Sequence, residues 1–172
     1  EPFGPMSRTP IVYVVYSQVA NRANRLTLTK QLLELGANPN DSHLDKNWPD
    51  NPLPILYAAA ARANDPELTE LLLDAGANPN DGESLYHATE HRDLRNLELL
   101  LKRGADVHPM VINHMLDHHD LRGLKLLLSY AKEITAEALT WAVTNECSLE
   151  ILQVLIENGA PINAKRDRDG VT

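Results

Sequence analysis

A nine-residue pattern recurs along this chain, and it constrains the fold more than any other feature. Each copy begins with two adjacent aliphatic residues and carries glycine at its fifth position. The four clear copies are Leu32–Asn40, Leu72–Asn80, Leu100–His108 and Leu155–Asn163, and a degenerate copy occupies Leu127–Glu133. Glycine adopts the left-handed backbone conformation that ends a helix without a Cβ penalty. Each copy therefore predicts the end of a buried helix, and the recurrence predicts stacked repeats.

The spacing of the copies supports a repeat architecture. Steps of 40, 28, 27 and 28 residues separate the equivalent positions, which are Gly36, Gly76, Gly104, Ala131 and Gly159. Periods of about 20–50 residues are typical of solenoids and arrays. Each unit also has a front half before this ending. Apolar openings mark it in the first three units, at Thr9–Val15, Leu53–Ala59 and Glu83–Thr89. Each unit is thus predicted to form a helix, a short turn, a second helix and a loop.

These openings and endings resemble those of the ankyrin repeat family, whose units begin with a Thr-Pro-Leu-His-like segment and end in Leu-Leu-x-x-Gly-Ala-Asp/Asn. The resemblance covers about residues 9–163, and the third unit aligns throughout from Glu83 to His108. It implies an all-α, ankyrin-like helix-turn-helix solenoid. Because the family period is about 33 residues, the shorter steps predict shortened fingers between the repeats.

The repeats set the expected domain boundaries. We expect five ankyrin-like repeats in residues 9–163, with approximate limits of 9–40, 53–80, 83–108, 109–133 and 134–163. Residues 1–8 are expected to be an N-terminal tail or residues foreign to the natural chain. Residues 164–172 are expected to begin a further, truncated repeat, so the chain is expected to be part of a larger protein.

Composition narrows the function classes. The formal net charge of −8 disfavours general nucleic-acid binding, which requires a basic face. No apolar run approaches the ~20 residues that a membrane-spanning helix needs. The single cysteine, Cys147, excludes an intrachain disulfide and suits a reducing compartment. We therefore expect an intracellular, cytoplasmic protein, with a secreted effector as the alternative.

Histidines form the only cluster of reactive residue types. His87 and His91 lie four residues apart, a spacing found on the zinc-binding helix of some metalloproteases, and His114 and His118 repeat it. One hypothesis is therefore a metal-dependent or catalytic protein that uses a histidine ladder. The alternative is a set of recognition residues on related repeats. We favour the latter because no third ligand with fixed geometry can be named, and we expect no cofactor, no metal and no catalytic residues.

The ankyrin resemblance implies a partner-binding surface on the concave face of stacked first helices. Each repeat would offer one or two exposed side chains late in its first helix. The predicted residues are Ala60, Ala61, Glu90, His91, Asp117, His118, Thr144 and Asn145. Trp48 is a possible loop contact, and it either folds back as a plug or anchors a partner. Trp141, which aligns with His87, is expected in the core.

The sequence therefore predicts a non-enzymatic protein–protein interaction module. We expect a monomer that binds a protein partner, and neither nucleic acid nor a membrane. The acidic surface favours a partner with basic or hydrogen-bonding groups. The module could be the recruiting part of a larger adaptor or effector, and self-association through an uncapped end is a third option.

Overall fold

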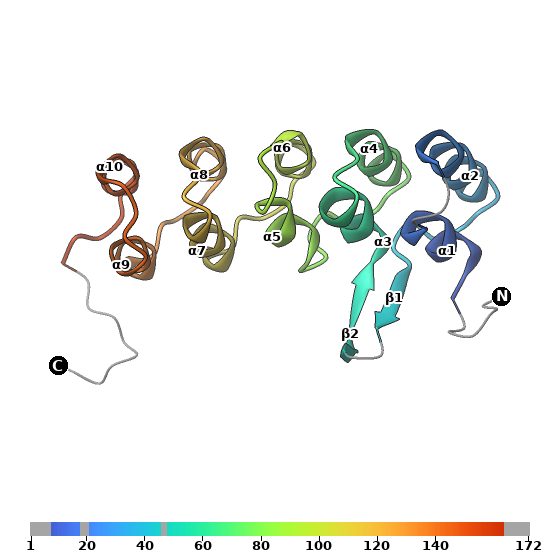
Figure 1. Ribbon diagram of the computed structural model, residues 1–172, viewed down its shortest axis with the longest axis horizontal. Helices are drawn as coiled ribbons and strands as arrows, with labels where there is room; N and C mark the ends of the chain where they lie inside the picture. The colour runs from blue at the N-terminus through green and yellow to red at the C-terminus, as the bar shows by residue number, and fades with distance from the viewer. Residues whose placement is uncertain (1–7, 18–20, 46–47, 164–172) are drawn as a thin grey trace. The chain divides into compact units, whose positions relative to one another are not determined.

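The computed structural model describes residues 8–17, 21–45 and 48–163, with the side chains of residues 45–49 outside this description (Figure 1). It comprises two compact units, residues 1–105 (unit 1) and 106–172 (unit 2). Both units consist of paired helices joined by short turns, and unit 1 also contains a β-hairpin. The predicted helix-turn-helix solenoid with shortened fingers is confirmed, with this hairpin as an addition.

The described residues of unit 1 form three helix pairs. Their helices alternate between two layers (Figure 1). The first helix of each pair lies in one layer and the second in the other. The elements are α1 (Pro10–Tyr16), α2 (Arg22–Glu34), α3 (Ile55–Tyr57) continued by η1 (Ala58–Arg62), α4 (Pro66–Asp74), α5 (Ser84–Ala88) and α6 (Arg95–Lys102). Helix α1 packs on η1, η1 on α5, α2 on α4, and α4 on α6. Each repeat therefore contacts its neighbours along the stack, as solenoids do.

The long connector between the first two repeats forms a β-hairpin. Strand β1 (Ser42–Asp45) pairs antiparallel with β2 (Trp48–Pro54), and Ser42 lies opposite Pro54. The base of the hairpin is held by Tyr16, whose hydroxyl donates to the carbonyl oxygens of Leu53 (2.9 Å) and Pro54 (3.0 Å). The connector between the first two repeats is therefore an ordered hairpin.

The described residues of unit 2 form two helix pairs: α7 (Pro109–Asp117) with α8 (Leu121–Leu128), and α9 (Ala136–Thr144) with α10 (Leu149–Glu157). Helix α7 packs on α9, and α8 packs on α10. Local sequence explains where several of these helices begin. Asp120 and Ser148 cap α8 and α10 by accepting hydrogen bonds from backbone N–H groups in the first turn. The predicted limits of the five repeats stay a prediction.

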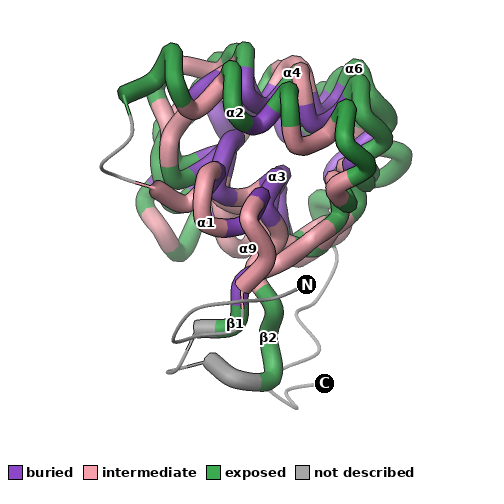
Figure 2. Tube along the Cα trace, turned by 90° about the vertical axis from the view of Figure 1, so that its right-hand side faces the viewer, coloured by how far each residue is buried: buried purple, intermediate pink, exposed green. Residues whose placement is uncertain are grey.

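Repeated leucines of the last four copies lie in the core of each unit, whereas Leu32 and Leu33 of the first copy are half-buried. Leu72 and Leu100 in unit 1 and Leu127 and Leu155 in unit 2 are all fully buried. Figure 2 shows that α3 in unit 1 is buried whereas α2 is largely exposed. The predicted helix stops are also present, because Gly36, Gly76, Gly104 and Gly159 have φ between 90° and 96°. No helix in the described part of the chain combines the length and the apolar character needed to cross a membrane.

Candidate partner-binding surfaces

In unit 1 the predicted residues Glu90 and His91 lie in the turn after α5, not within a helix. Helix α5 ends at Ala88, and the next backbone bonds run from Thr89 N–H to Tyr86 and from Glu90 N–H to His87. Each of these hydrogen bonds joins an N–H group to the carbonyl three residues earlier, which tightens the chain into a turn. The prediction that Glu90 and His91 occupy the end of the first helix is therefore wrong.

The prediction that Ala60 and Ala61 are exposed is also wrong, because they are 0% and 5% accessible. Both belong to the wide π-helical turn η1, whose carbonyls are bonded by the following repeat. Asn96 Nδ2 donates to the Ala60 carbonyl at 3.1 Å, and His91 Nε2 bonds the Ala61 carbonyl. His91 therefore joins two repeats, and the alanines are covered by the contact.

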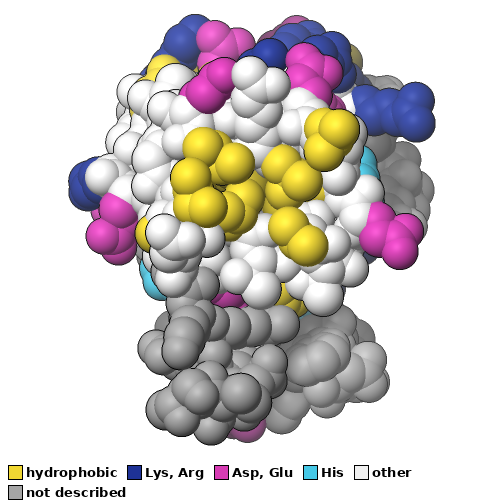
Figure 3. Space-filling view, turned by 90° about the vertical axis from the view of Figure 1, so that its left-hand side faces the viewer, with side chains coloured by type: hydrophobic (Ala, Val, Ile, Leu, Met, Phe, Trp, Pro, Cys, Tyr) yellow, Lys and Arg dark blue, Asp and Glu magenta, His cyan; other side chains and the backbone are white. Residues whose placement is uncertain are grey.

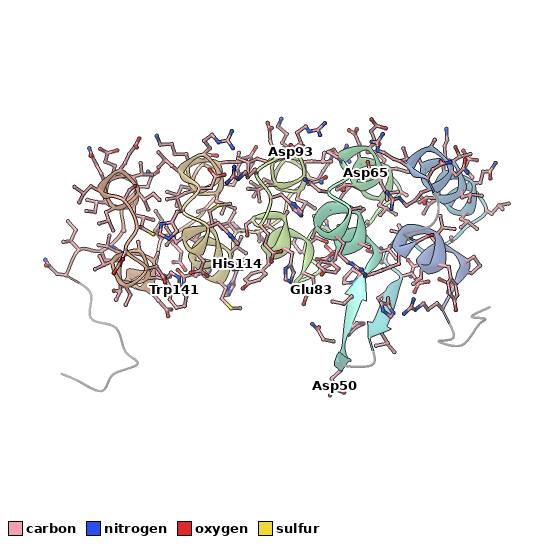
Figure 4. The ribbon with its side chains drawn as sticks, in the orientation of Figure 1. Asp50, Asp65, Glu83, Asp93, His114 and Trp141 are labelled. Carbon is pink, nitrogen blue, oxygen red and sulfur yellow. The ribbon has the colours of Figure 1, made fainter. Side chains whose placement is uncertain are left out.

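Glu90 remains exposed and forms part of a polar chain across the same side of unit 1. His87 Nδ1 lies 2.6 Å from Glu90 Oε1, and His87 Nε2 lies 3.3 Å from Glu83 Oε2. Asn51 of the hairpin donates to Glu83 at 2.9 Å, and Figure 4 labels Glu83 on the layer that contains the first helices. The rings of Tyr57 and Tyr86 stand edge-on to His87 at 5.1 and 5.0 Å. A row of acidic and aromatic groups thus lines α5.

The histidine spacing that suggested metal binding does not bring His87 and His91 together within unit 1. His87 faces two carboxylates, whereas His91 bonds the carbonyl of Ala61. In unit 2 the rings of His114 and His118 do meet, with centroids 4.9 Å apart in an edge-on arrangement. The metal-dependent or catalytic alternative stays an untested prediction.

Unit 2 concentrates its polar contacts on Asp117, the last residue of α7. The indole Nε1 of Trp141 donates to Asp117 Oδ1 at 2.7 Å, and Asn145 Nδ2 donates to the same oxygen at 3.4 Å. His114 Nδ1 lies 3.6 Å from Asp117 Oδ2. A carboxylate is thereby oriented by donors from a neighbouring repeat, and its side chain is still 38% exposed.

Trp141 is half-buried, which corrects its predicted place in the core. Figure 4 shows Trp141 on α9 and His114 on α7 toward the same side of unit 2. Thr144 and His118 are exposed, and Asn145 also donates to the Trp141 carbonyl at 3.1 Å. The sequence did indicate that Trp141 would have a hydrogen-bond acceptor nearby, because a buried indole N–H usually bonds one.

Two further single residues are Trp48 in unit 1 and Cys147 in unit 2. Trp48 begins strand β2, but its side chain lies outside the described residues, so its role as plug or partner anchor stays a prediction. Cys147 is buried, and its Sγ lies 3.5 Å from the Leu116 carbonyl oxygen. Burial raises the pKa of this thiol, which disfavours the reactive thiolate.

Apolar side chains gather on the side of unit 2 that carries α9 and α10 (Figure 3). Val143 is 61% and Ile156 is 41% exposed, whereas the equivalent residues of the preceding repeat, Leu116 and Leu128, are 1% and 7% exposed. The preceding residues are covered because α9 and α10 pack on their helices. Val143 and Ile156 thus occupy positions that a neighbouring helix pair buries.

Comparison with known proteins agrees with this architecture. A family model described as ankyrin repeats (3 copies) matches residues 17–111. Among solved structures, the ankyrin repeat domain of Bcl-3, a member of the IkappaB family, has a TM-score of 0.72 at 20% identity, over 94% of this chain and 74% of that one. The human ASB11 ankyrin repeat domain has a TM-score of 0.60 at 16% identity, over 93% and 88%. A search of curated proteins found no significant match. The chain belongs to the ankyrin repeat family.

Proposed function

We propose that this chain is a non-enzymatic protein-binding module whose contact residues lie at the ends of its first helices. Ankyrin repeats in general are protein–protein interaction modules. In unit 1 the proposed contact is Glu90 with the aromatic rings beside it. In unit 2 the proposed contacts, called the α7–α9 surface here, are Asp117, His118, Trp141, Thr144 and Asn145.

The observation that carries the proposal is the orientation of Asp117 by Trp141 and Asn145. A side chain held in place before binding loses less conformational entropy when a partner arrives. Tryptophan is also enriched among residues that dominate interface energies. The arrangement therefore combines a fixed acceptor with a large aromatic surface.

The charge of these contacts suggests what the partner presents. Glu90 and Asp117 are acidic acceptors, while Asn145 and the imidazoles can also accept or donate hydrogen bonds. A lysine, an arginine or a backbone N–H of the partner would complement them. We further propose that the module acts as a monomer inside the cell, and that it recruits this partner for a larger adaptor or effector.

The proposal can be tested with affinity capture from a cell lysate followed by affinity measurement. The immobilised chain would capture candidate partners, and each candidate would be purified and its Kd measured by calorimetry. The test variant carries Glu90→Lys and Asp117→Lys. We expect its Kd to rise about 100-fold or more, because like charges across an interface cost several kcal/mol.

A matched control separates this effect from net charge. Glu70→Lys with Glu150→Lys makes the same change of charge on exposed residues of α4 and α10. The control should keep the wild-type Kd. Asp117→Asn, which preserves the shape and an acceptor oxygen, should give an intermediate Kd. Equal affinity of the folded test variant and the wild type would refute the proposed contact residues.

A further inference from the structure

A cleft in unit 1 collects arginines, although the chain as a whole carries a net charge of −8. Its larger part has a volume of about 440 Å³ and is lined by Arg22, Arg25, Arg95, Asp65 and Glu67, among others. A smaller adjoining part shares Arg25 and Ala63 with the first and is also lined by Tyr16, Ser17 and Arg62. Four guanidinium groups thus border two adjoining depressions, together called the cleft here.

Arg22 and Arg25 already form ion pairs with carboxylates of the cleft. Arg22 makes hydrogen bonds of 2.8 and 2.9 Å to Asp65, which is almost fully buried, and lies 3.0 Å from Glu67. Arg25 lies 3.8 Å from the same Asp65 carboxylate and donates to the Ser17 carbonyl. These contacts hold α2 against the start of α4, and Figure 4 shows Asp65 at α4.

Arg95 is paired outside the cleft, and Arg62 has no acidic partner among the described residues. Arg95 makes hydrogen bonds of 2.6 to 3.0 Å to Asp93. Arg62 is exposed, and its guanidinium stacks over the ring of Tyr16 at 5.5 Å. Among the described residues no carboxylate lies within ion-pair distance of Arg62. The four guanidiniums are therefore balanced by two carboxylates of the cleft, Asp65 and Glu67, and by Asp93 outside it. The remaining positive charge is that of Arg62.

The backbone adds to the positive potential of the cleft. The first residues of α2, α4 and α6 line it, namely Arg22, Pro66 and Arg95. The N-terminus of a helix carries partial positive charge, because its first N–H groups have no partner within the helix. The Tyr16 ring also restricts the Arg62 guanidinium that lies over it, and a planar guanidinium can bind a carboxylate through two parallel hydrogen bonds.

We propose that this cleft binds an acidic peptide segment of a partner, with a glutamate or aspartate carboxylate seated between Arg62 and Arg25. A planar guanidinium matches a carboxylate in a two-bond fork, which favours this ligand. The excess of one positive charge suits a short acidic segment. Nucleic acid needs many phosphate contacts, and the chain's overall acidity opposes it.

This site is separate from the surfaces proposed above. Its residues come from α1, α2, η1, α4 and α6, and none of them is Glu90 or a member of the α7–α9 surface. The chemistry is also opposite, because the cleft would take acidic groups and Asp117 would take donors. Failure of one proposal therefore leaves the other standing.

A defined probe tests the cleft directly. The probe is a fluorescently labelled hexapeptide of alternating glutamate and glycine, and its neutral counterpart alternates glutamine and glycine. Fluorescence anisotropy at about 20 mM salt should show binding of the acidic probe alone, weakened as salt is raised. Arg62→Gln should raise the Kd about tenfold, as expected when a charge-assisted hydrogen bond is lost.

Three further variants sharpen the result. Arg62→Lys keeps the charge but loses the planar fork, so its Kd should fall between those of the wild type and Arg62→Gln. Glu67→Gln removes a carboxylate that competes for Arg22, so it should lower the Kd about two- to fivefold. Arg122→Gln, an exposed arginine of unit 2, removes the same charge elsewhere and should leave the Kd unchanged.

Several results would overturn the cleft proposal. One is absence of binding of the acidic probe at low salt. Another is equal weakening by Arg62→Gln and Arg122→Gln, which would mean that the probe senses only overall charge. Preferential binding of a single-stranded hexanucleotide, with the same dependence on Arg62, would assign the cleft to nucleic acid instead.

Discussion

Trp141 and Asp117 are joined across neighbouring repeats by a 2.7 Å hydrogen bond from the indole Nε1 to Oδ1. Helix α9 supplies the donor and α7 the acceptor, so packing of the two helices fixes the geometry. The bond positions an acidic group at the surface of unit 2 without burying it. It therefore links the fold of this unit to its proposed binding role.

The first prediction follows from that bond. Trp141→Phe keeps an aromatic ring but removes the donor to Asp117. We expect a loss of about 1 kcal/mol in the free energy of unfolding, as is usual for one hydrogen bond, and weaker partner binding. Urea denaturation followed by circular dichroism measures the first effect. A variant as stable as the wild type would show that the bond adds nothing in solution.

His91 gives a second prediction, on stability alone. His91→Ala leaves the Ala61 carbonyl without its side-chain partner, and we expect a loss of about 1–2 kcal/mol in the free energy of unfolding. His118, one repeat later, is exposed and bonds no carbonyl in the contacts described, so His118→Ala should change stability by less than about 0.5 kcal/mol. Equal effects of the two substitutions in thermal unfolding would contradict the joining role of His91.

Leu100 tests the assignment of the core. It is fully buried in unit 1, and Leu100→Ala should lower the free energy of unfolding by about 2–5 kcal/mol. The matched control is Leu35→Ala, because Leu35 is 85% exposed. This variant should lose less than about 0.5 kcal/mol in the free energy of unfolding. Neighbouring repeats share one core, so hydrogen exchange in α4 should also accelerate. Melting of the Leu100 variant within a degree of the wild type would refute this assignment.

Tyr16 makes stability depend on pH. Burial, the largest cause, raises the pKa of its hydroxyl in the folded state. The folded chain then holds this proton more tightly than the unfolded chain does. The resulting stability is fully present below about pH 10, the ordinary pKa of tyrosine, and is lost as the pH rises above it.

The comparison with Tyr16→Phe isolates this effect. Near neutral pH the variant should be less stable by about 1 kcal/mol, because it lacks the bonds to Leu53 and Pro54. The difference should shrink between pH 10 and 11.5 as the wild type loses its advantage. Urea midpoints measured across this range provide the check, and a constant difference would contradict a raised pKa.

Repetition in the sequence was enough to predict the helical framework. The glycines at 36, 76, 104 and 159 marked helix ends because only their left-handed backbone closes a helix cheaply, and all four have positive φ. Leu100 and its equivalents were predicted in the core because apolar residues at helical spacing must be buried together. Such signals are local and recur in each repeat.

What the sequence did not predict depends on contacts distant in the chain. The hairpin was missed because Pro49, Pro52 and Pro54 make β2 unlike a typical strand. The burial of Ala60 and Ala61 depends on the wide turn η1 and on side chains about 30 residues later. The arginine cleft likewise needs Arg22 to meet Asp65 across 43 positions. The spacing of residues along the sequence does not indicate which distant residues come into contact.

We propose above all that a protein partner binds at the ends of the first helices. The most direct test is to measure hydrogen exchange of the chain with and without its captured partner. We predict that binding slows exchange in residues 84–91, 109–118 and 136–145, while α8 and α10 keep their rates. The wild type and the Glu90→Lys, Asp117→Lys variant should differ in this protection under identical conditions. Protection confined to α8 and α10, with unchanged exchange in α5, α7 and α9, would contradict the account.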